Sequence, residues 1–489
     1  MRIPEEHPPS FNKNALKLDA LDFGSPCHSD KASRERNPRI ALLTPYLGGN
    51  LGDAAIQDAI IANIRLRLPG AQFSGISLNC DNFLERHGVG AFPLCGTGRP
   101  FYGMSRGSVG DQPGQGKNST AGSSQKGLDA AVIKRALKRV PALWRCLKTV
   151  HAWVTGPGRE LRHCFKGYRF LHSQDFLIVS GGGQLDEEWG GPWGHPFALF
   201  KWAVLARIAQ VPYVMASVGA QKAASATSRL FMSAALRLAR YRSYRDKNSR
   251  EIAAGLLHRA KEDPVVPDLA FSLPPLELPM PAGIRATAQG RPTIAISPIA
   301  YAKPGRWPCG DRALYDRYLK QLARVVAQLL ERGYFLVLVW SSIGDDESVI
   351  PELLGCLDHD SNKKLTGQMH IPTITTWKDL VAVLLDVDFL IASRLHSAIL
   401  GFVTQTPTIA ISFDPKVDWV MEELGQTDYL LQIRDFVAKE VIQALERIKL
   451  RRNVVVEQIA SYQSRVLSLC ARQYDALVDL AIASCRHRS

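Results

Sequence analysis

Short apolar runs recur along the chain, and each is followed by glycine or charged residues and then by a segment with helical spacing. This alternation is typical of parallel sheets, whose strands are buried on both faces and are joined by helices. In the first half, strands are predicted at 39–44, 73–77, 175–179, 211–221 and 241–244. In the second half, they are predicted at 293–299, 334–342, 389–393 and 407–413.

The two series of strands predict an α/β protein with two Rossmann-like domains of parallel sheet that face a cleft, the GT-B-like arrangement of glycosyltransferases. We expect the first domain at 39–275 and the second at 291–432, joined by a proline-bearing linker at 276–290. Residues 1–38 are interpreted as a disordered tail and 433–489 as C-terminal helices. The first domain also carries an insertion at 96–172, which opens with a stretch rich in Gly and Ser.

Composition narrows the class of protein. With 489 residues, 46% of them apolar, the chain can bury two cores, and no apolar stretch is long enough for a transmembrane helix. The polar N-terminus predicts no secretory signal. Nine scattered cysteines without a CxxC pair indicate reduced thiols and a cytoplasmic protein. No spacing typical of metal ligands occurs, so we expect neither a metal nor a cofactor.

Positive charge is concentrated in one segment. Between Lys126 and His172, eleven Lys and Arg residues stand against two acidic residues, which gives nine of the fourteen net positive charges. Apolar residues at near-helical spacing, with Trp144 and Trp153 among them, fit either a surface helix on anionic lipid or a solvated helix packed on the domain. The second is the commoner case, because charged amphipathic helices occur on many globular proteins. Nucleic acid is not expected as a partner, because no aromatic and basic single-strand platform accompanies the charge.

The candidate site begins at the stretch 386–401, DVDFLIASRLHSAILG. A buried strand runs into Arg394, Leu395 and His396, and a helix of small residues follows. Because alternate side chains of an extended segment share a face, we expect Arg394 and His396 to project together and Leu395 to enter the core. A guanidinium, an imidazole and a helix N-terminus favour a small polyanion. The alternative is that both side chains merely cap an edge.

Three other predicted strand ends carry glycine or charge. The first strand leads into a glycine loop with Asn50 and Asp53, which is neither a GxGxxG nor a Walker A loop. Asp53 is predicted either to cap the following helix or to act as a base. The triple glycine with Gly182 and Gly183 follows the strand at 175–179, and Arg245 follows the strand at 241–244. In a parallel sheet these ends share one edge.

Taken together, these motifs resemble those of the polysaccharide pyruvyl transferase family. The resemblance spans about 40 to 430 and lies in GNLGDAAI (49–56), SGGGQL (180–185), SVGAQ (217–221), YRDKNS (244–249), PDLAF (267–271), SRLHSAI (393–399) and DPKV (414–417). It implies transfer of the pyruvyl unit of phosphoenolpyruvate onto sugar hydroxyls of a polysaccharide or its lipid-linked precursor, with formation of a pyruvate ketal. The tail, the insertion and the basic segment lie outside the resemblance.

The resemblance also implies roles for particular residues. His396 would be the general acid that protonates the methylene carbon of the donor, and Arg245 and Arg394 would bind its carboxylate and phosphate. Ser397 and Lys416 would complete the donor site. The acceptor would bind to the N-terminal half, at Asn50, Asp53, Gly182, Gly183 and Gln184. The alternatives are a GT-B glycosyltransferase that uses a nucleotide-sugar and a non-catalytic scaffold of polysaccharide assembly, bound at the inner face of the membrane.

Overall fold

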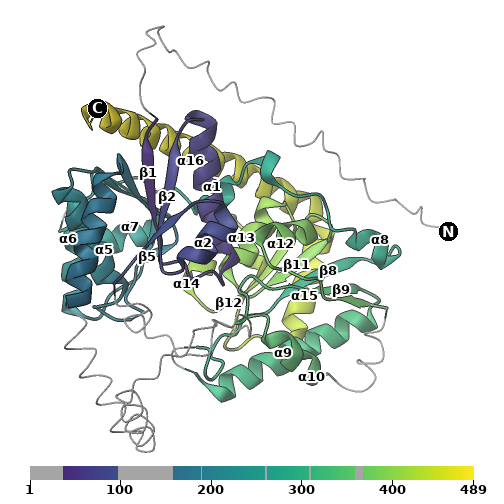
Figure 1. Cartoon of the computed structure of the whole chain (residues 1–489). Coiled ribbons are helices and arrows are strands. Elements are labelled where there is room, and N and C mark those ends of the chain that lie inside the picture. The colour runs from purple at the N-terminus through teal and green to yellow at the C-terminus, as the bar shows by residue number, and fades with distance from the viewer. Residues whose placement is uncertain are drawn as a thin grey trace, which may run out of the picture. The chain divides into compact units, whose positions relative to one another are not determined.

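The computed structural model describes residues 37–96, 158–188, 190–258, 262–307, 310–357 and 367–488 (Figure 1). These residues belong to one compact unit, Asn37–Ser489. Two predicted segments lie outside the described residues. They are residues 1–36 of the tail expected at 1–38 and residues 97–157 of the insertion expected at 96–172. In these ranges, no helix combines the length and the apolar character needed to cross a membrane.

The first sheet is parallel throughout and has the strand order β3-β2-β1-β4-β6-β5, with β7 paired to β6. The strands are β1 (Arg39–Leu43), β2 (Gln72–Ser77), β3 (Ala91–Pro93), β4 (Phe176–Ser180), β5 (Gly183–Leu185), β6 (Tyr213–Ala220) and β7 (Tyr241–Tyr244). The strand order reverses direction between β1 and β4, where Ile40 is in register with Phe176. In sheets of this type, ligands bind at the carboxyl ends of the strands beside this reversal.

The second sheet repeats the plan with the order β10-β9-β8-β11-β12-β13, again parallel. Its strands are β8 (Thr293–Ser297), β9 (Phe335–Leu338), β10 (Met369–His370), β11 (Phe389–Ala392), β12 (Thr408–Ser412) and β13 (Leu430–Gln432). Here the reversal lies between β8 and β11, and β11 is the strand predicted to carry Arg394 and His396. The predicted fold class of two parallel α/β sheets is confirmed.

Helices connect the strands and cover the sheets. Those of the first half are α1 (Leu51–Arg67), α2 (Cys80–His87), a helix at 158–172, α5 (His195–Ile208), α6 (Ala226–Leu238) and α7 (Lys247–Leu257). Those of the second half are α8 (Ile284–Ala288), α9 (Arg312–Glu331), α10 (Val349–Gly355), α12 (Trp377–Leu384), α13 (Leu395–Val403), α14 (Pro415–Glu423) and α15 (Ala438–Leu450). The stretch expected as a linker at 276–290 is therefore partly helical, because it contains α8.

The last helix, α16 (Arg452–Arg488), returns from the second sheet to the first (Figure 1). It packs against α1 and α13. Near its end, the Ser484 hydroxyl donates a hydrogen bond to the backbone oxygen of Asp175 at 2.6 Å, and the Gln473 amide donates one to Ser217 at 3.0 Å. The helices expected at 433–489 thus also bind the first sheet.

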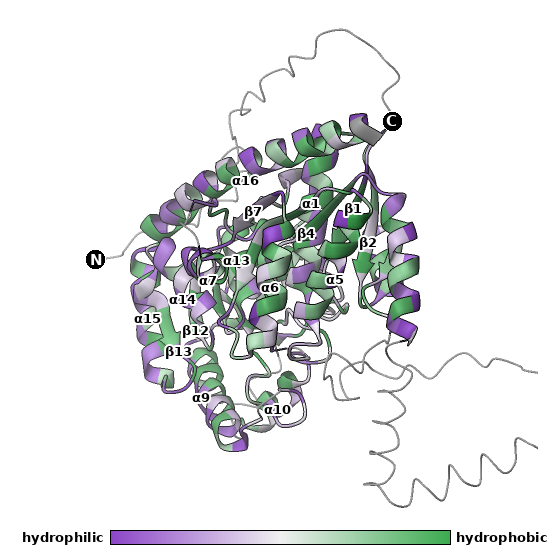
Figure 2. Cartoon of the chain, turned by 90° about the vertical axis from the view of Figure 1, so that its left-hand side faces the viewer, coloured by the Kyte–Doolittle hydropathy of each residue, from purple (hydrophilic) through white to green (hydrophobic). Residues whose placement is uncertain are grey.

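One hydrophobic cluster connects the two sheets. It includes Ile60 of α1 and Ile399 of α13, both completely buried, together with apolar residues of α16. Figure 2 shows the largely hydrophobic strands β1, β2 and β4, and helices around them that mix hydrophobic and hydrophilic residues. Because α1 packs on α12 and α13, the N-terminus of α1 is held against the second sheet.

Candidate active site

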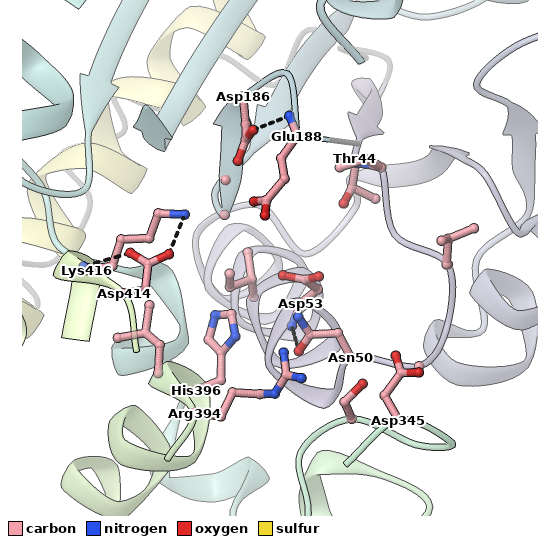
Figure 3. Close-up of a pocket in the computed structure, with 18 of the residues that line it drawn as sticks. Thr44, Asn50, Asp53, Asp186, Glu188, Asp345, Arg394, His396, Asp414 and Lys416 are labelled. Carbon is pink, nitrogen blue, oxygen red and sulfur yellow. Dashed lines mark hydrogen bonds and ion pairs between the residues drawn. The ribbon is translucent and has the colours of Figure 1, made fainter. Parts of the chain in front are cut away.

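A cavity of about 520 Å³ lies between the carboxyl edges of the two sheets (Figure 3). From the first sheet it is lined by the loop between β1 and α1, the glycine loop after β4, and Arg245 after β7. From the second sheet it is lined by residues after β8, after β9 and after β11, and by the start of α14. The cavity therefore lies at the strand reversals of both sheets, where the fold favours a ligand.

Backbone hydrogen bonds join the two halves at this cavity. The N–H of Leu51 donates to the oxygen of Ser341 at 2.8 Å, and the N–H of Ile343 donates to the oxygen of Gly49 at 2.8 Å. Asn50 and Ser342 thus form an antiparallel bridge between the loop before α1 and the loop after β9. The first turn of α1 is consequently fixed to the second sheet.

The first turn of α1 carries two of the predicted acceptor residues. Asn50 caps the helix, because its Oδ1 accepts hydrogen bonds from the N–H groups of Gly52 at 3.0 Å and Asp53 at 3.4 Å. The capping role considered for Asp53 thus belongs to Asn50. Asp53 lies in the first turn and borders the cavity. Burial raises the pKa of Asp53 above its usual value, even though the positive charge of His396 opposes the shift.

The glycine loop after β4 folds tightly. Gly181 and Gly182 have left-handed backbone conformations, with φ of 52° and 69°, which glycine adopts without strain. Gln184 is buried within the loop, where its amide donates to the oxygen of Gly181 at 2.7 Å and its Oε1 lies 2.9 Å from Nε2 of His195. Gln184 therefore fixes the loop, and Gly182 and Gly183 bring backbone to the cavity wall.

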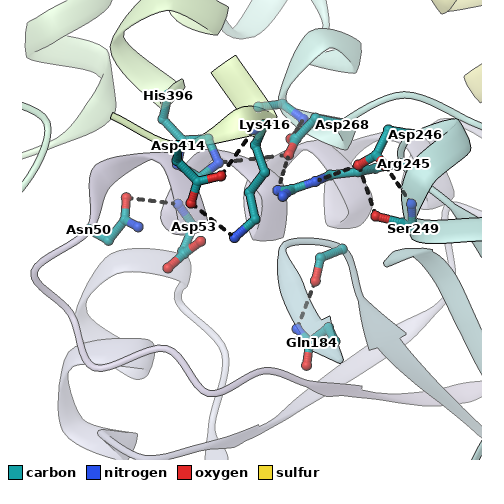
Figure 4. Close-up of polar contacts among 12 residues, drawn as sticks. Asn50, Asp53, Gln184, Arg245, Asp246, Ser249, Asp268, His396, Asp414 and Lys416 are labelled. Atoms are coloured by element: carbon teal, nitrogen blue, oxygen red, sulfur yellow. Dashed lines mark hydrogen bonds and ion pairs between the residues drawn. The ribbon is translucent and has the colours of Figure 1, made fainter. Parts of the chain in front are cut away.

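His396, Arg245 and Asp268 form a buried cluster at the cavity (Figure 4). Nε2 of His396 lies 3.7 Å from Oδ2 of Asp268, and Nη1 of Arg245 lies 3.6 Å from the same oxygen. His396 comes from the first turn of α13, whereas Arg245 follows β7 and Asp268 precedes a 3₁₀ turn on the side of the first sheet. The structure thus brings together two of the predicted donor residues from opposite sheets.

The positions of His396 and Arg245 both depend on glycine. A Cβ atom built on Gly52 in α1 would lie 1.9 Å from Cγ of His396, and one built on Gly219 would lie 2.8 Å from the guanidinium of Arg245. No side chain larger than hydrogen fits at either position without displacing the neighbouring residue. Gly52 belongs to the GNLGDAAI motif and Gly219 to the SVGAQ motif. The glycines in these two motifs are thus required because a larger side chain would collide with His396 or Arg245.

Arg394 is held differently from Arg245. Its Nε and Nη2 donate two parallel hydrogen bonds to the carboxylate of Asp346, at 2.5 and 2.7 Å, and Asp346 is completely buried. Burial disfavours its charge, but Asp346 outweighs this and raises the pKa of Arg394. Arg394 and His396 both line the cavity, as predicted, but the largely buried Leu395 borders it too, because α13 begins at Leu395 and the three residues do not form an extended segment. One edge of the Arg394 guanidinium, however, is already occupied.

Two further donor residues were predicted, Ser397 and Lys416, and only Lys416 lines the cavity. Ser397 is completely buried below the cavity, where its hydroxyl lies 2.7 Å from that of Ser297 and donates to that of Ser341 at 2.9 Å. It packs loop ends of the second sheet together and does not line the cavity, because the first turn of α13 directs it inward. Lys416 lines the cavity from the first turn of α14, and its Nζ lies 3.6 Å from Oδ2 of Asp414.

Several cavity residues were not singled out from the sequence. Tyr301, Trp307 and Phe413 form an aromatic wall on the second sheet, with ring centroids 5.2 to 5.5 Å apart. Arg306 lies in the same loop, with Nη1 3.5 Å from Asp345. The loop sequence YAKPGRWPCG was read as a connection, and its aromatic and basic residues were the available signal. In the described ranges, no group of three or more His, Cys, Asp or Glu residues could hold a metal ion.

Comparison with known families agrees with the motifs. The sequence model of the family described as polysaccharide pyruvyl transferase matches residues 50–415. The chain belongs to this family. It is therefore a transferase, and the predicted family is confirmed. A search of curated proteins gave no match to the transferase.

Solved structures similar to the transferase share its fold. A putative UDP-N-acetylglucosamine 2-epimerase from Listeria monocytogenes has a TM-score of 0.50 and 8% identity, over 90% of this chain and 97% of that chain. A glycosyltransferase from Rickettsia africae has a TM-score of 0.48 and 12% identity, over 90% of this chain and 98% of that chain. At such identities the likeness concerns the fold alone. Its two parallel sheets on either side of a cavity form the predicted GT-B-like arrangement, with which the Listeria structure, at a TM-score of 0.50, agrees.

Proposed function

We propose that the transferase moves the pyruvyl unit of phosphoenolpyruvate onto two hydroxyls of a saccharide and forms a pyruvate ketal. The observation that carries the proposal is the pair of open donors at the cavity. Nη2 of Arg245 and Nε2 of His396 are buried, and neither has a hydrogen-bond partner in the described part of the chain. Buried donors are nearly always paired, and Oδ2 of Asp268, 3.7 Å from Nε2 of His396, is too far to accept a hydrogen bond from it, so these two donors favour a further anionic ligand.

The reaction that we propose begins with a proton. His396 gives a proton to the methylene carbon of phosphoenolpyruvate, and the oxygen of a first sugar hydroxyl bonds to C2. The proton of that hydroxyl restores His396. A second hydroxyl oxygen then bonds to C2 as the C2–O bond to phosphate breaks, and its proton leaves with hydrogen phosphate. The product is a ketal with a methyl group and a carboxylate on C2, so protons and bonds balance.

We assign different tasks to the cations. Arg245 has a free donor edge and loose ion pairs, so we assign it direct contact with the donor anion. Arg394, paired with Asp346, supplies a fixed positive charge with its remaining N–H groups. Lys416 borders the same cavity and can neutralise a further anionic oxygen. Together these residues and His396 suit an anion that carries both a carboxylate and a phosphate.

We propose that the saccharide acceptor binds in the same cavity, next to these cations. Asn50, Asp53 and the backbone of Gly182 and Gly183 offer polar groups on the side of the first sheet, and Asp53 lies close enough to His396, Arg245 and Arg394 to interact with their charges. The aromatic wall on the second sheet offers apolar faces, which suit the C–H faces of a pyranose ring. The acceptor would therefore contact both halves of the chain, and not the N-terminal half alone.

One assay tests the donor. The full-length transferase is incubated with phosphoenolpyruvate and a panel of methyl hexopyranosides and lipid-linked oligosaccharides, and phosphate release and product mass are measured. We expect phosphate release coupled to a pyruvyl mass increment, and its loss in His396→Ala. The control His370→Ala changes an exposed histidine of β10 and should keep activity. Turnover with nucleotide-sugars but none with phosphoenolpyruvate would instead support the glycosyltransferase alternative, and turnover with neither would support a scaffold.

We further propose that the basic segment 126–172 contacts an anionic membrane surface, where a lipid-linked acceptor would lie. Only 158–172 of this segment is described, and it forms a helix. Leu161 and Phe165 on this helix are 73% and 63% exposed, and the side chains of Arg162 and Lys166 beside them are also exposed. Exposed apolar side chains among basic ones suit a surface with anionic headgroups.

Vesicle sedimentation tests this contact. Reversing two charges in Arg162→Glu/Lys166→Glu should weaken binding to phosphatidylglycerol vesicles and leave the weak binding to phosphatidylcholine vesicles unchanged. The matched control is Lys320→Glu/Arg324→Glu, which reverses two exposed charges with the same spacing on α9. An equal effect of both double variants would mean that net charge, and not this helix, controls the binding.

A further inference from the structure

Asp268 lies where the two halves of the site meet, and no step proposed above uses it. It is 3% exposed, and its Oδ1 accepts a hydrogen bond from the N–H of Ala270 at 3.0 Å. Its Oδ2 lies 3.7 Å from Nε2 of His396 and 3.6 Å from Nη1 of Arg245 (Figure 4). One oxygen therefore fixes the carboxylate to its own turn, and the other is directed at both site cations.

The three side chains are incompletely paired for groups so deeply buried. His396 is 7% exposed and Arg245 is 8% exposed. In the described ranges, Oδ2 of Asp268, Nε2 of His396 and Nη2 of Arg245 each have no hydrogen-bond partner. The two distances to Asp268 are those of ion pairs and exceed those of hydrogen bonds. The carboxylate thus acts on both cations by charge, and their donors stay open.

We propose that Asp268 is a positioning residue that keeps His396 charged and beside Arg245 until the donor binds, an inference that rests on the proposed function. A carboxylate next to an imidazole favours the protonated ring, and the general acid must carry its proton when the donor arrives. The same carboxylate repels an incoming anion. Asp268 therefore promotes proton transfer and slightly opposes donor binding.

The surroundings of Asp268 support this role. The charged and titratable groups that interact with Asp268 or His396 come from α1, the end of β7 and α16. They are Asp53, Arg245, Cys470 and Tyr474. Burial and, to a smaller extent, the negative charge of Asp268 raise the pKa of Cys470 to about 12. Burial also raises the pKa of Tyr474. Both therefore stay neutral. Burial opposes ionisation of Asp268, but His396 and Arg245 outweigh it and lower the pKa of Asp268.

Asp268→Asn separates this role from a purely structural one, because it removes the charge and keeps the shape. In the full-length transferase, we expect the alkaline limb of the kcat profile to move to lower pH. At pH 8, kcat should fall at least about tenfold. The KM for phosphoenolpyruvate should stay level or fall, because a repelling charge is gone. Asp268→Glu, which keeps the charge, should move the alkaline limb back part of the way towards its wild-type pH.

Asp58 provides a matched control. It lies on α1 outside the cavity, and its carboxylate pairs with Nδ1 of His87 and accepts a hydrogen bond from Trp377, both at 2.6 Å. Asp58→Asn should lower the stability of the fold and leave the alkaline limb in place. A limb that moves equally in both variants, or in neither, overturns the role of Asp268.

A measurement without turnover keeps this inference distinct from the proposed function. The ring signal of His396 is followed by NMR as a function of pH and is identified by its loss in His396→Gln. We expect its titration midpoint to fall in Asp268→Asn, because the variant removes the carboxylate that favours the protonated ring. If the wild-type chain releases no phosphate from phosphoenolpyruvate, the proposed function fails while this titration still tests Asp268. An unchanged midpoint overturns the inference even in an active enzyme.

Discussion

Replacing Gly52 by alanine tests whether His396, the proposed general acid, must lie against the first turn of α1. The added Cβ would lie 1.9 Å from Cγ of His396 and 2.3 Å from both its Cβ and its Nδ1. Carbon atoms in contact are about 3.5–4.0 Å apart, so the ring or the helix must move by roughly 1.5–2 Å. The ring is buried between α1 and Asp268, and α1 is hydrogen-bonded to Ser341. Neither can move freely.

The expected effect of Gly52→Ala on activity is larger than its effect on stability. Alanine in a helix is about 1 kcal/mol more favourable than glycine, whereas overpacking a buried site costs about 1–3 kcal/mol. The net loss of unfolding free energy is therefore about 0–2 kcal/mol. A misplacement of about 1 Å can cost roughly 100-fold in rate, so kcat should fall at least about 100-fold.

Phosphate release from phosphoenolpyruvate and thermal unfolding measure the two effects. Gly255→Ala is the control, because Gly255 also lies within a helix, α7, but no atom lies within 4 Å of the Cβ that alanine would add. This variant should keep full activity and be slightly more stable. A Gly52→Ala variant with wild-type kcat would refute the reasoning, since His396 would then tolerate displacement or have no part in the reaction.

Three further predictions concern other parts of the site. Asp346→Ala leaves the guanidinium of Arg394 without its partner, so urea denaturation should show a loss of about 3–5 kcal/mol, and an unchanged value would contradict this pairing. Burial lowers the pKa of His195 to about 3, so stability should fall by about 1.4 kcal/mol per unit as the pH drops from about 6.5 towards 3. When the free energy of unfolding is measured at pH 7 and at pH 4.5, His195→Gln should lose less stability between these two pH values than the wild-type chain. Trp307→Ala should raise the KM for the saccharide about 3- to 10-fold with little change for phosphoenolpyruvate, and equal changes would contradict the aromatic wall.

Much of the fold followed from the apolar pattern. Strands buried on both faces leave uninterrupted apolar runs, and the strand expected at 389–393 is observed as Phe389–Ala392. The short strand β5 (Gly183–Leu185) was read as a loop, because three residues that begin with glycine carry no such run. The return of α16 to the first sheet was also not foreseen. Its contacts there use Gln473 and Ser484, single polar residues that no periodicity marks.

The sequence predicted which residues meet at the cavity where strand ends determine their position. Arg245, Arg394 and His396 follow strands of parallel sheets, so the topology alone brings them to the edges that face each other. Their acidic partners, Asp268 and Asp346, lie in turns whose positions depend on the packing of the whole chain. The sequence shows acidic residues there but does not show which cation each one meets.

The two arginines of the site therefore differ in kind, although the sequence suggested one role for both. Arg394 is committed to a buried carboxylate of its own half through two hydrogen bonds, so a bound anion meets a cation that is already fixed. Arg245 has one long hydrogen bond to Asp246, at 3.4 Å, a loose ion pair with Asp268, and a buried donor without a partner in the described chain, so an anion can complete its hydrogen bonds. Binding energy is gained where partners are missing, whereas fixed charge lowers the cost of charge movement during the reaction. Arg245 should consequently control donor binding, and Arg394 should control the electrostatics of the step that follows.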